Sequence, residues 1–474
     1  MGLVSGTGDS ESRFRSYVEA LTSALGHADR SKPFQSYCTG LLLPGPRKSV
    51  EPMAARMEPG RVQAAHQSLH HFVAKADWSD EGVLTAVRHR VVPMIERRGA
   101  IRAWIVDDTG FPKKGTHSVG VARQYCGQLG KQDNCQVAVS LSVANQHASL
   151  PIAYRLYLPE AWAKDTVRRR KAGVPDDIAF QTKPQIALEQ LRLALEAGVA
   201  PATVLADAGY GIDTDFRDGV TALGLSYVVG IQSSTSLWAP GTAPLPPKRW
   251  RGIGRPPSLI RPDDKHKPVS AKQMALALPK RSWRRVTWRE GTHARLTSCF
   301  AAARVRPAHR LQSHQPETRG MVFDRMPLRR SRADQIRLAT LPAEMSLREL
   351  VYMAKLRWRI ERDYQELKQE LGLGHYEGRG WRGFHHHATF AIAAYGFLIS
   401  ERSAIPPRRN AEARSSKHLA YPQVIDPVDP PIRPERHVLN SITTVGVIIA
   451  RALARNLARC PCCQQLRSSR LVTQ

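Results

Sequence analysis

Acidic residues, cysteines and long apolar runs are all scarce in this sequence of 474 residues. Its 41 Asp and Glu stand against 70 Lys and Arg, which leaves a formal net charge of +29. The seven cysteines are odd in number and widely scattered, which excludes the dense disulfide framework of a small secreted protein. The longest apolar stretches, 388–399 and 445–450, are shorter than the roughly 20 residues of a membrane-spanning helix. Residues 1–30 lack the basic start and apolar run of a secretory signal. We therefore expect a cytoplasmic protein without a membrane partner.

The excess of positive charge indicates the class of partner. Hydrophobic residues make up 42% of the chain, which is enough for a buried core and excludes a mostly disordered polyelectrolyte. Lys and Arg on such a surface neutralise phosphates and release the counterions condensed on them. Residues 252–257 lack the strand, glycine pattern and helix of a nucleotide-binding loop, so no ATP is expected. Nucleic acid is the predicted partner.

Hydrophobic spacing divides the chain into three predicted parts. Apolar residues recur at spacings of three and four within 14–25 and 61–73, which predicts a helical N-terminal domain over 1–95. We expect this domain to bind DNA. From residue 101 onward, short apolar runs that end in turn residues alternate with a helical pattern over 184–198. This alternation predicts a mixed α/β sheet covered by helices over 96–400. Residues 401–474 are predicted to form a Pro-rich linker and a C-terminal helical tail.

A basic insertion interrupts the predicted α/β domain at about 232–345. Residues 248–290 contain thirteen Lys or Arg against three acids, together with three tryptophans that include Trp250 and Trp288. The helical pattern returns only at residue 347. This composition is typical of a subdomain inserted into the sheet.

Three acidic features are candidates for chemistry. The run AWIVDDTGFPKKG ends a predicted strand with two adjacent carboxylates, and VLADAGYG ends another with one. A predicted helix, RWRIERDYQELKQELGLGHYE, carries a carboxylate between two cations on one stripe. Taken singly, the first is equally well explained as a strand-end turn, the second is better explained as such a turn, and the third is more commonly a solvated helix with ion pairs. The acids are Asp107, Asp108, Asp207 and Glu361, and the cations are Arg357 and Lys368.

Together the three features indicate a different chemistry. Carboxylates at two neighbouring strand ends, with a third from a helix laid across them, can hold two divalent cations about 3.5 to 4 Å apart. Such hard oxygen ligands suit Mg²⁺, and Mn²⁺ can substitute. Combined with the net charge of +29, the pattern predicts metal-dependent cleavage of DNA.

The sequence resembles the bacterial insertion-sequence transposases of the DDE superfamily, specifically the IS4-like cut-and-paste group. The resemblance covers about residues 33–400. It rests on the stretches RKSVEPMAAR, HQSLHHFVAKADW, DDTGFPKKGTHSVGVARQYCGQLGKQDNCQVAVS, VLADAGYG and RWRIERDYQELKQELGLGHYEGRGW. It implies an RNase H-like catalytic core with an insertion between the second Asp and the Glu. It also implies a nucleoid-associated bacterial protein that acts as a homodimer on double-stranded DNA.

The resemblance also implies which acids are catalytic. Asp108, which precedes Thr109, is the expected first acid, and Asp107 is the alternative because a single sequence does not define the strand register. Asp207 is the expected second acid, and Glu361 the third. In the family's mechanism one metal ion activates a water that cuts the DNA at an element end, and a second stabilises the leaving 3′ oxygen. The freed 3′-OH then joins target DNA.

The third acid is assigned from the family's helix motif, which is Tyr, two residues, Arg, three residues, Glu, six residues, Lys. Arg357 and Lys368 match the Arg and Lys and are expected to hold phosphates. Ala354 stands where the Tyr is expected, and Tyr352 or Tyr364 is the candidate replacement. Glu366 is a weaker candidate for the acid because the Arg and Lys spacings do not fit it.

Further residues are expected to contact DNA. Lys113, Lys114 and Arg123 would line the approach of the backbone, the alternative being a solvated basic loop. Trp250 or Trp288 would stack on an unpaired base, the alternative being packing inside a small β subdomain. A second functional class is a non-catalytic DNA-binding protein derived from a transposase. A third is a repair nuclease that cuts without regard to terminal repeats.

Overall fold

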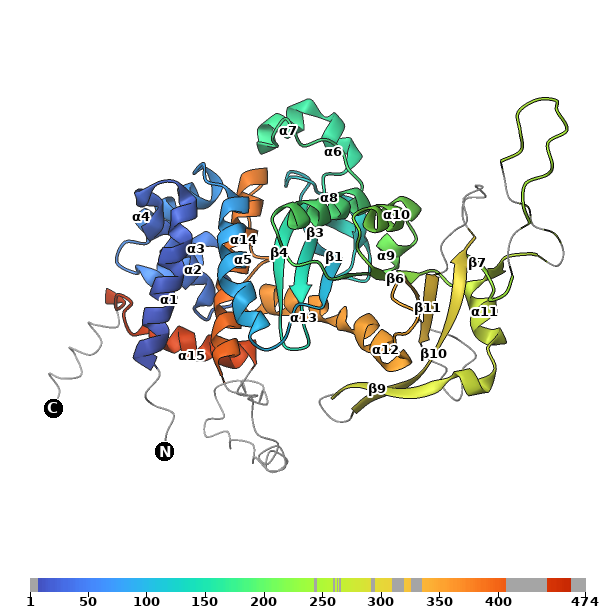
Figure 1. Ribbon diagram of the computed structural model, residues 1–474. Coiled ribbons are helices and arrows are strands. Elements are labelled where there is room, and N and C mark those ends of the chain that lie inside the picture. Colours follow the sequence, from blue (N-terminus) through green and yellow to red (C-terminus); the bar gives the residue numbers. More distant parts are fainter. Residues whose placement is uncertain are drawn as a thin grey trace, which may run out of the picture.

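The computed structural model describes residues 7–242, 245–258, 261, 263, 266–290, 295–308, 319–324, 335–405 and 441–461. Figure 1 shows helices at one end of the molecule, a sheet covered by helices in the middle, and a β-rich extension at the other end. The predicted Pro-rich linker lies outside the described residues, apart from its first few. Within the described part of the chain, no helix has both the length and the apolarity needed to span a membrane.

The helical N-terminal region is confirmed. Its apolar stripes face one another, so that residues such as Phe14, Leu41 and Val87 are buried in a common core. The helices are α1 (Thr7–Thr22), α2 (Ser31–Leu42), α3 (Val50–Met57), α4 (Val62–Ala74) and α5 (Asp80–Glu96).

The central sheet has the strand order β4-β3-β1-β5-β6. Strand β3 is antiparallel to both β1 and β4, whereas β5 is parallel to β1 and β6 is parallel to β5. Short β2 pairs with the far end of β3 as a hairpin. This topology confirms the RNase H-like mixed sheet. The strands are β1 (Ala103–Pro112), β2 (Ala122–Cys126), β3 (Lys131–Ala144), β4 (Ser149–Leu156), β5 (Thr203–Ala206) and β6 (Tyr227–Ile231).

The β-rich insertion is also confirmed. It leaves the sheet after β6 and returns through β12 (Gln335–Ala339), which pairs antiparallel with β6 and extends the sheet. Its elements are β7 (Ser236–Trp238), β8 (Val269–Ser270), α11 (Ala271–Ala277), β9 (Arg284–Glu290), β10 (Arg295–Pro307) and β11 (Arg319–Asp324).

Helices cover both faces of the central sheet, with α8 and α10 on one face and α12 and α13 on the other (Figure 1). The helix predicted at 184–198 is α8. It begins with a capping box between Thr182 and Gln185 and is followed by Gly198, whose φ of 71° is the left-handed conformation that ends helices. The helices in this part of the chain, including those four, are α6 (Glu160–Lys164), α7 (Thr166–Ala172), α8 (Lys183–Glu196), α9 (Ala208–Gly211), α10 (Thr214–Ala222), α12 (Leu347–Leu356) and α13 (Trp358–Gln369).

Helix α14 (Trp381–Ala404) joins the helical end to the sheet. Every residue from Gly383 to Ile399 is buried, because α14 packs against α2, α4 and α5 as well as β4. The last described helix, α15 (Ile442–Ala454), packs on α1, α2 and α14. Both C-terminal helices therefore share a core with the N-terminal helices, while the predicted division at residues 95 and 400 stays a prediction.

Candidate active site

Alternation along β1 separates the two adjacent aspartates. Ile105 belongs to a core cluster with Ile360 and Tyr364 of α13, whereas Val106 belongs to the main core, which includes residues of α8. Successive side chains of a strand point to opposite faces, so Asp107 lies on the α13 face and Asp108 on the α8 face.

Asp107 lies between two other groups of the predicted site. Its carboxylate accepts a hydrogen bond from Arg357 Nη1 at 2.7 Å, and Arg357 Nη2 donates to Glu361 at 2.8 Å. One guanidinium on the α12–α13 junction thus connects the two acids. Burial raises the pKa of Asp107 to about 7; Arg357 opposes the rise, while Asp207 and Asp108 add to it. The charge of Asp207 acts on Asp107 because both carboxylates lie at the same pocket.

Asp108 has a different partner. Its carboxylate forms an ion pair of 2.9 Å with Lys183 Nζ, and both side chains are about a quarter exposed (25% and 30%). Lys183 is the first residue of α8, where the capping box positions it over the end of β1. Asp108 is therefore neutralised from the face opposite to Glu361.

Asp207 follows β5 directly and caps the short helix α9 by accepting a hydrogen bond from Gly209 N at 2.8 Å. Helix α9 then lies against the backbone of β6. A Cβ at Gly211 would come within 1.8 Å of the Gly230 carbonyl oxygen, and a Cβ at Gly230 would come within 2.7 Å of Ala208 N. Gly211 and Gly230 are thus needed for the close approach of α9 to β6, next to the end of β5 where Asp207 lies.

We expect Gly211→Ala to destabilise the fold by about 1–3 kcal/mol, because the clash is with backbone and cannot be relieved by a side-chain rotation. Urea unfolding monitored by tryptophan fluorescence measures the change. Gly115→Ala is the matched control, since nothing lies within 4 Å of its Cβ position, and we expect a change below about 0.5 kcal/mol. Equal stability of the two variants would contradict the close packing of α9 on β6.

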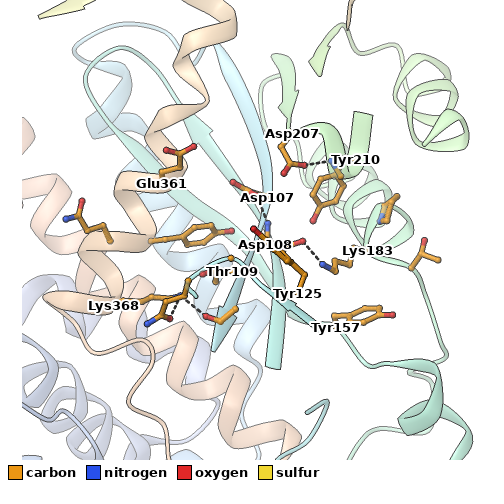
Figure 2. Close-up of a pocket in the computed structure, with 18 of the residues that line it drawn as sticks. Asp107, Asp108, Thr109, Tyr125, Tyr157, Lys183, Asp207, Tyr210, Glu361 and Lys368 are labelled. Atoms are coloured by element: carbon orange, nitrogen blue, oxygen red, sulfur yellow. Dashed lines mark hydrogen bonds and ion pairs between the residues drawn. The ribbon is translucent and has the colours of Figure 1, made fainter. Parts of the chain in front are cut away.

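The four acids line one open pocket of about 880 Å³. Figure 2 shows Asp107 between Glu361 and Asp207, with Asp108 directed to Lys183. Tyr210 also lines the pocket, next to Asp207 in Figure 2, and its buried hydroxyl has no hydrogen-bond partner among the described residues. The other lining residues include Thr109, Tyr125, Gln128, Tyr157, Thr182, Tyr364 and Lys368.

The remaining parts of the helix motif are distributed as follows. Lys368 lines the pocket and donates to the Gly110 carbonyl at 2.8 Å, and burial lowers its pKa to about 8. Tyr364 also lines the pocket, with its hydroxyl 2.8 Å from Ser140 Oγ, whereas Tyr352 is 44% exposed on α12. Ala354 is buried in the core of the α13 face. Glu366 is buried on another side of α13 and pairs with Arg362.

The other predicted DNA contacts lie outside the pocket lining. Lys113 is half-buried and donates to the Tyr376 carbonyl at 2.9 Å, while Lys114 and Arg123 are exposed. Trp288 packs edge-on against Phe300 in a small core of the insertion. Trp250 is 51% exposed on a loop of the insertion.

The acidic oxygens fit a hard divalent cation in their chemistry, because the pocket offers carboxylates and no thiol. Within the described ranges, however, no three acidic, His or Cys side chains are close enough to hold one ion together. The guanidinium of Arg357 lies between Asp107 and Glu361, and a cation bridging those two acids would have to displace it.

Comparison with known proteins gives the family. A model of the DDE superfamily endonucleases matches residues 20–295, which is more than half of the chain and includes Asp107, Asp108 and Asp207. This chain belongs to the DDE superfamily of endonucleases. It is also 32% identical, over 169 residues, to a probable transposase for insertion sequence element IS701 from Microchaete diplosiphon. That match covers 35% of this DDE superfamily member and 41% of the relative.

Sequence reasoning missed several residues of the pocket, of which Lys183 and Tyr210 lie nearest the acids in Figure 2. Lys183 stands at the start of a predicted helix, and the capping pattern of Thr182 and Gln185 is the signal that the helix begins there; that its first turn faces the pocket is not encoded locally. Tyr210 lies inside the quoted run VLADAGYG, three residues after Asp207. Its position on the first turn of α9 follows from Asp207 being the helix cap.

Proposed function

We propose that this protein is a DDE transposase. It binds the terminal inverted repeats of its insertion sequence, cuts the DNA there by two-metal hydrolysis and joins the 3′-OH ends to target DNA. The observation that carries the proposal is the meeting of Asp107, Asp207 and Glu361, from β1, the end of β5 and α13, at one pocket of a strongly basic protein. The proposal also includes cytoplasmic action on the nucleoid and a homodimer that pairs two ends.

In this proposal Asp107 replaces Asp108 as the first metal ligand. Asp107 lies on the face of Glu361 and interacts with Asp207, whereas Asp108 is directed to Lys183. Two Mg²⁺ ions, or Mn²⁺ in their place, would supply Lewis-acid stabilisation to the attacking and leaving oxygens when bound there.

The chain's own residues bind and orient the DNA strand. Lys368 presents an ammonium at the pocket wall, where it can bind a phosphate oxygen. Arg123 and Tyr125 are two residues apart in β2, so both side chains lie on its exposed face. Because Tyr125 also lines the pocket, the DNA backbone can reach the acids along this hairpin. Arg357 spaces Asp107 from Glu361 and limits their mutual repulsion.

The test uses the full-length protein, a duplex carrying the ends of its own element, and Mg²⁺ or Mn²⁺. Transposase activity predicts 3′-OH ends at the repeat boundary and joining of those ends to a plasmid, both lost with EDTA. A non-catalytic DNA-binding protein would shift the duplex without nicking it. A repair nuclease would cut control DNA that lacks the repeats equally well. Either of these two results would overturn the proposal.

Arg357 offers a separate prediction. Arg357→Lys keeps the charge but removes the planar fork that reaches two carboxylates at once, so we expect cleavage to slow by about 10- to 100-fold. The measurement is the rate of nicking at saturating protein. Arg348→Lys on the exposed side of α12 is the matched control and should cut at the wild-type rate. Unchanged cleavage by Arg357→Lys would show that the two-pronged contact is dispensable.

A further inference from the structure

Helix α4 has a surface unlike that of every other described helix of this length. The thirteen residues Val62–Ala74 include no Asp, Glu, Lys or Arg, in a chain in which such residues make up 23%. Among the described helices of eight or more residues, α4 alone has this property. An exposed helix normally uses charged residues for its solvated side, so this composition requires an explanation.

The absence of charge is not due to burial. One side of α4 packs inward, where Phe72 stacks on Trp78 and Phe390 with ring centroids 5.7 and 5.3 Å apart. The opposite side is exposed and carries amide, hydroxyl, imidazole and methyl groups. Figure 1 places α4 at the edge of the molecule remote from the insertion. The exposed residues are Gln63, Ala64, Gln67, Ser68, His70 and His71.

These groups share one helical stripe. Gln63, Gln67 and His70 are spaced by four and three residues, as are Ala64, Ser68 and His71, so the two rows lie side by side. Glutamine amides can pair with both hydrogen-bonding groups that adenine presents in the major groove, and small methyl-bearing side chains contact the thymine methyl. Ala64 and Ser68 are short enough to let the helix axis approach the bases closely.

The turn that connects α3 to α4 and the cations at the ends of α4 also suit binding in the major groove. Helix α3 ends at Met57, and a tight four-residue turn, closed by a 2.9 Å hydrogen bond from Arg61 N to the Glu58 carbonyl, leads into α4. A short turn of this kind joins the two helices of helix-turn-helix motifs, whose second helix lies in the major groove. Exposed Arg61 and Lys75 flank α4 at its two ends, where cations contact phosphates.

We propose that α4 is the base-reading helix of this protein, with Gln63 and Gln67 selecting the sequence of double-stranded DNA through its major groove. Arg61 and Lys75 bind the phosphates on either side and carry no sequence information. The inference rests on the proposed transposase function, because it assigns the element that recognises the DNA ends.

The test is a selection from a library of randomised 25-bp duplexes by full-length protein, followed by affinity measurements at several salt concentrations. We expect wild type to enrich a consensus, and Gln63→Ala/Gln67→Ala to lose discrimination at one or two positions by about 5-fold or more. Arg61→Ala and Lys75→Ala should keep the consensus, weaken binding to all sequences, and each lower the salt slope by about 1. His89→Ala, an exposed histidine of α5, should behave as wild type.

The outcomes separate this inference from the function on which it rests. A double glutamine variant that keeps the wild-type consensus, or wild type that enriches none, overturns the inference. A change in oligomeric mass by light scattering without a change in consensus also overturns it, since α4 would then contact protein. Plasmid nicking with Mg²⁺ in the same preparations tests the catalytic proposal separately. If wild-type protein selects a consensus but never nicks DNA, the role of α4 stands and the transposase activity is refuted. Circular dichroism and thermal melting confirm that each variant is folded.

Discussion

Asp107→Asn should bind element ends normally but cut them about 10³-fold more slowly than wild type. The amide cannot replace a carboxylate that holds a divalent cation, and metal stabilisation is worth several kcal/mol, with each 1.36 kcal/mol equal to a factor of ten in rate. Asp108→Asn should slow cutting by no more than about 100-fold, because the lost ion pair with Lys183 only supports the neighbouring ligand. The measurement is single-turnover nicking with Mg²⁺ and with Mn²⁺, beside gel-shift binding.

The adjacent pair makes this comparison unusually well matched. The two substitutions remove the same charge from consecutive residues of one strand, so their effects on net charge and on strand propensity are alike. If Asp108→Asn abolishes cutting and Asp107→Asn does not, the choice of Asp107 as the metal ligand is wrong. The ligand is then Asp108, as expected from the sequence. If both variants cut as well as wild type, neither aspartate is a metal ligand.

Phe390→Ala should cause the largest loss of stability among single substitutions at the helical end, about 3–5 kcal/mol. Phe390 is fully buried in α14, and its ring contacts those of Phe34, Tyr37, Phe72 and Trp78, which come from α2, α4 and the segment that follows α4. Truncation leaves a cavity between aromatic rings that cannot all move inward together. Urea unfolding followed by circular dichroism measures the loss.

Two further variants define the cause of this loss. Phe180→Ala removes the same atoms from a side chain that is 39% exposed, and we expect it to cost less than about 1 kcal/mol. Phe390→Leu retains most of the buried volume and should cost less than Phe390→Ala. A loss below about 1 kcal/mol for Phe390→Ala would mean that α14 is not the shared core element described above.

Local patterns were sufficient to predict much of the fold. The run WIV before Asp107 and the run VLA before Asp207 are strands β1 and β5, and Gly198 lies where helix α8 is terminated. The basic composition after residue 231 coincides with the β-rich insertion. Such features depend on residues adjacent in the chain, whose preferences survive folding largely unchanged.

Pairings between distant segments could not be obtained in this way. The role of α14 as a core shared by the helical end and β4 depends on contacts across more than 200 residues, and its nearly uniform apolarity indicates burial without naming the partner. Lys183 was missed for the same reason. Its ion pair joins the start of α8 to Asp108, 75 residues earlier.

The amino-acid sequence by itself determined that this protein is basic, has an α/β core with strand-end carboxylates, and resembles the DDE transposases. Only the tertiary structure distinguished Asp107 from Asp108. Strand β1 is buried on both faces, so its apolar run does not alternate with polar residues. The sequence of β1 therefore does not indicate which of its residues face α13 and which face α8. That distinction arises when α13 covers one face and α8 the other, which brings Glu361 and Arg357 to Asp107 and leaves Lys183 for Asp108.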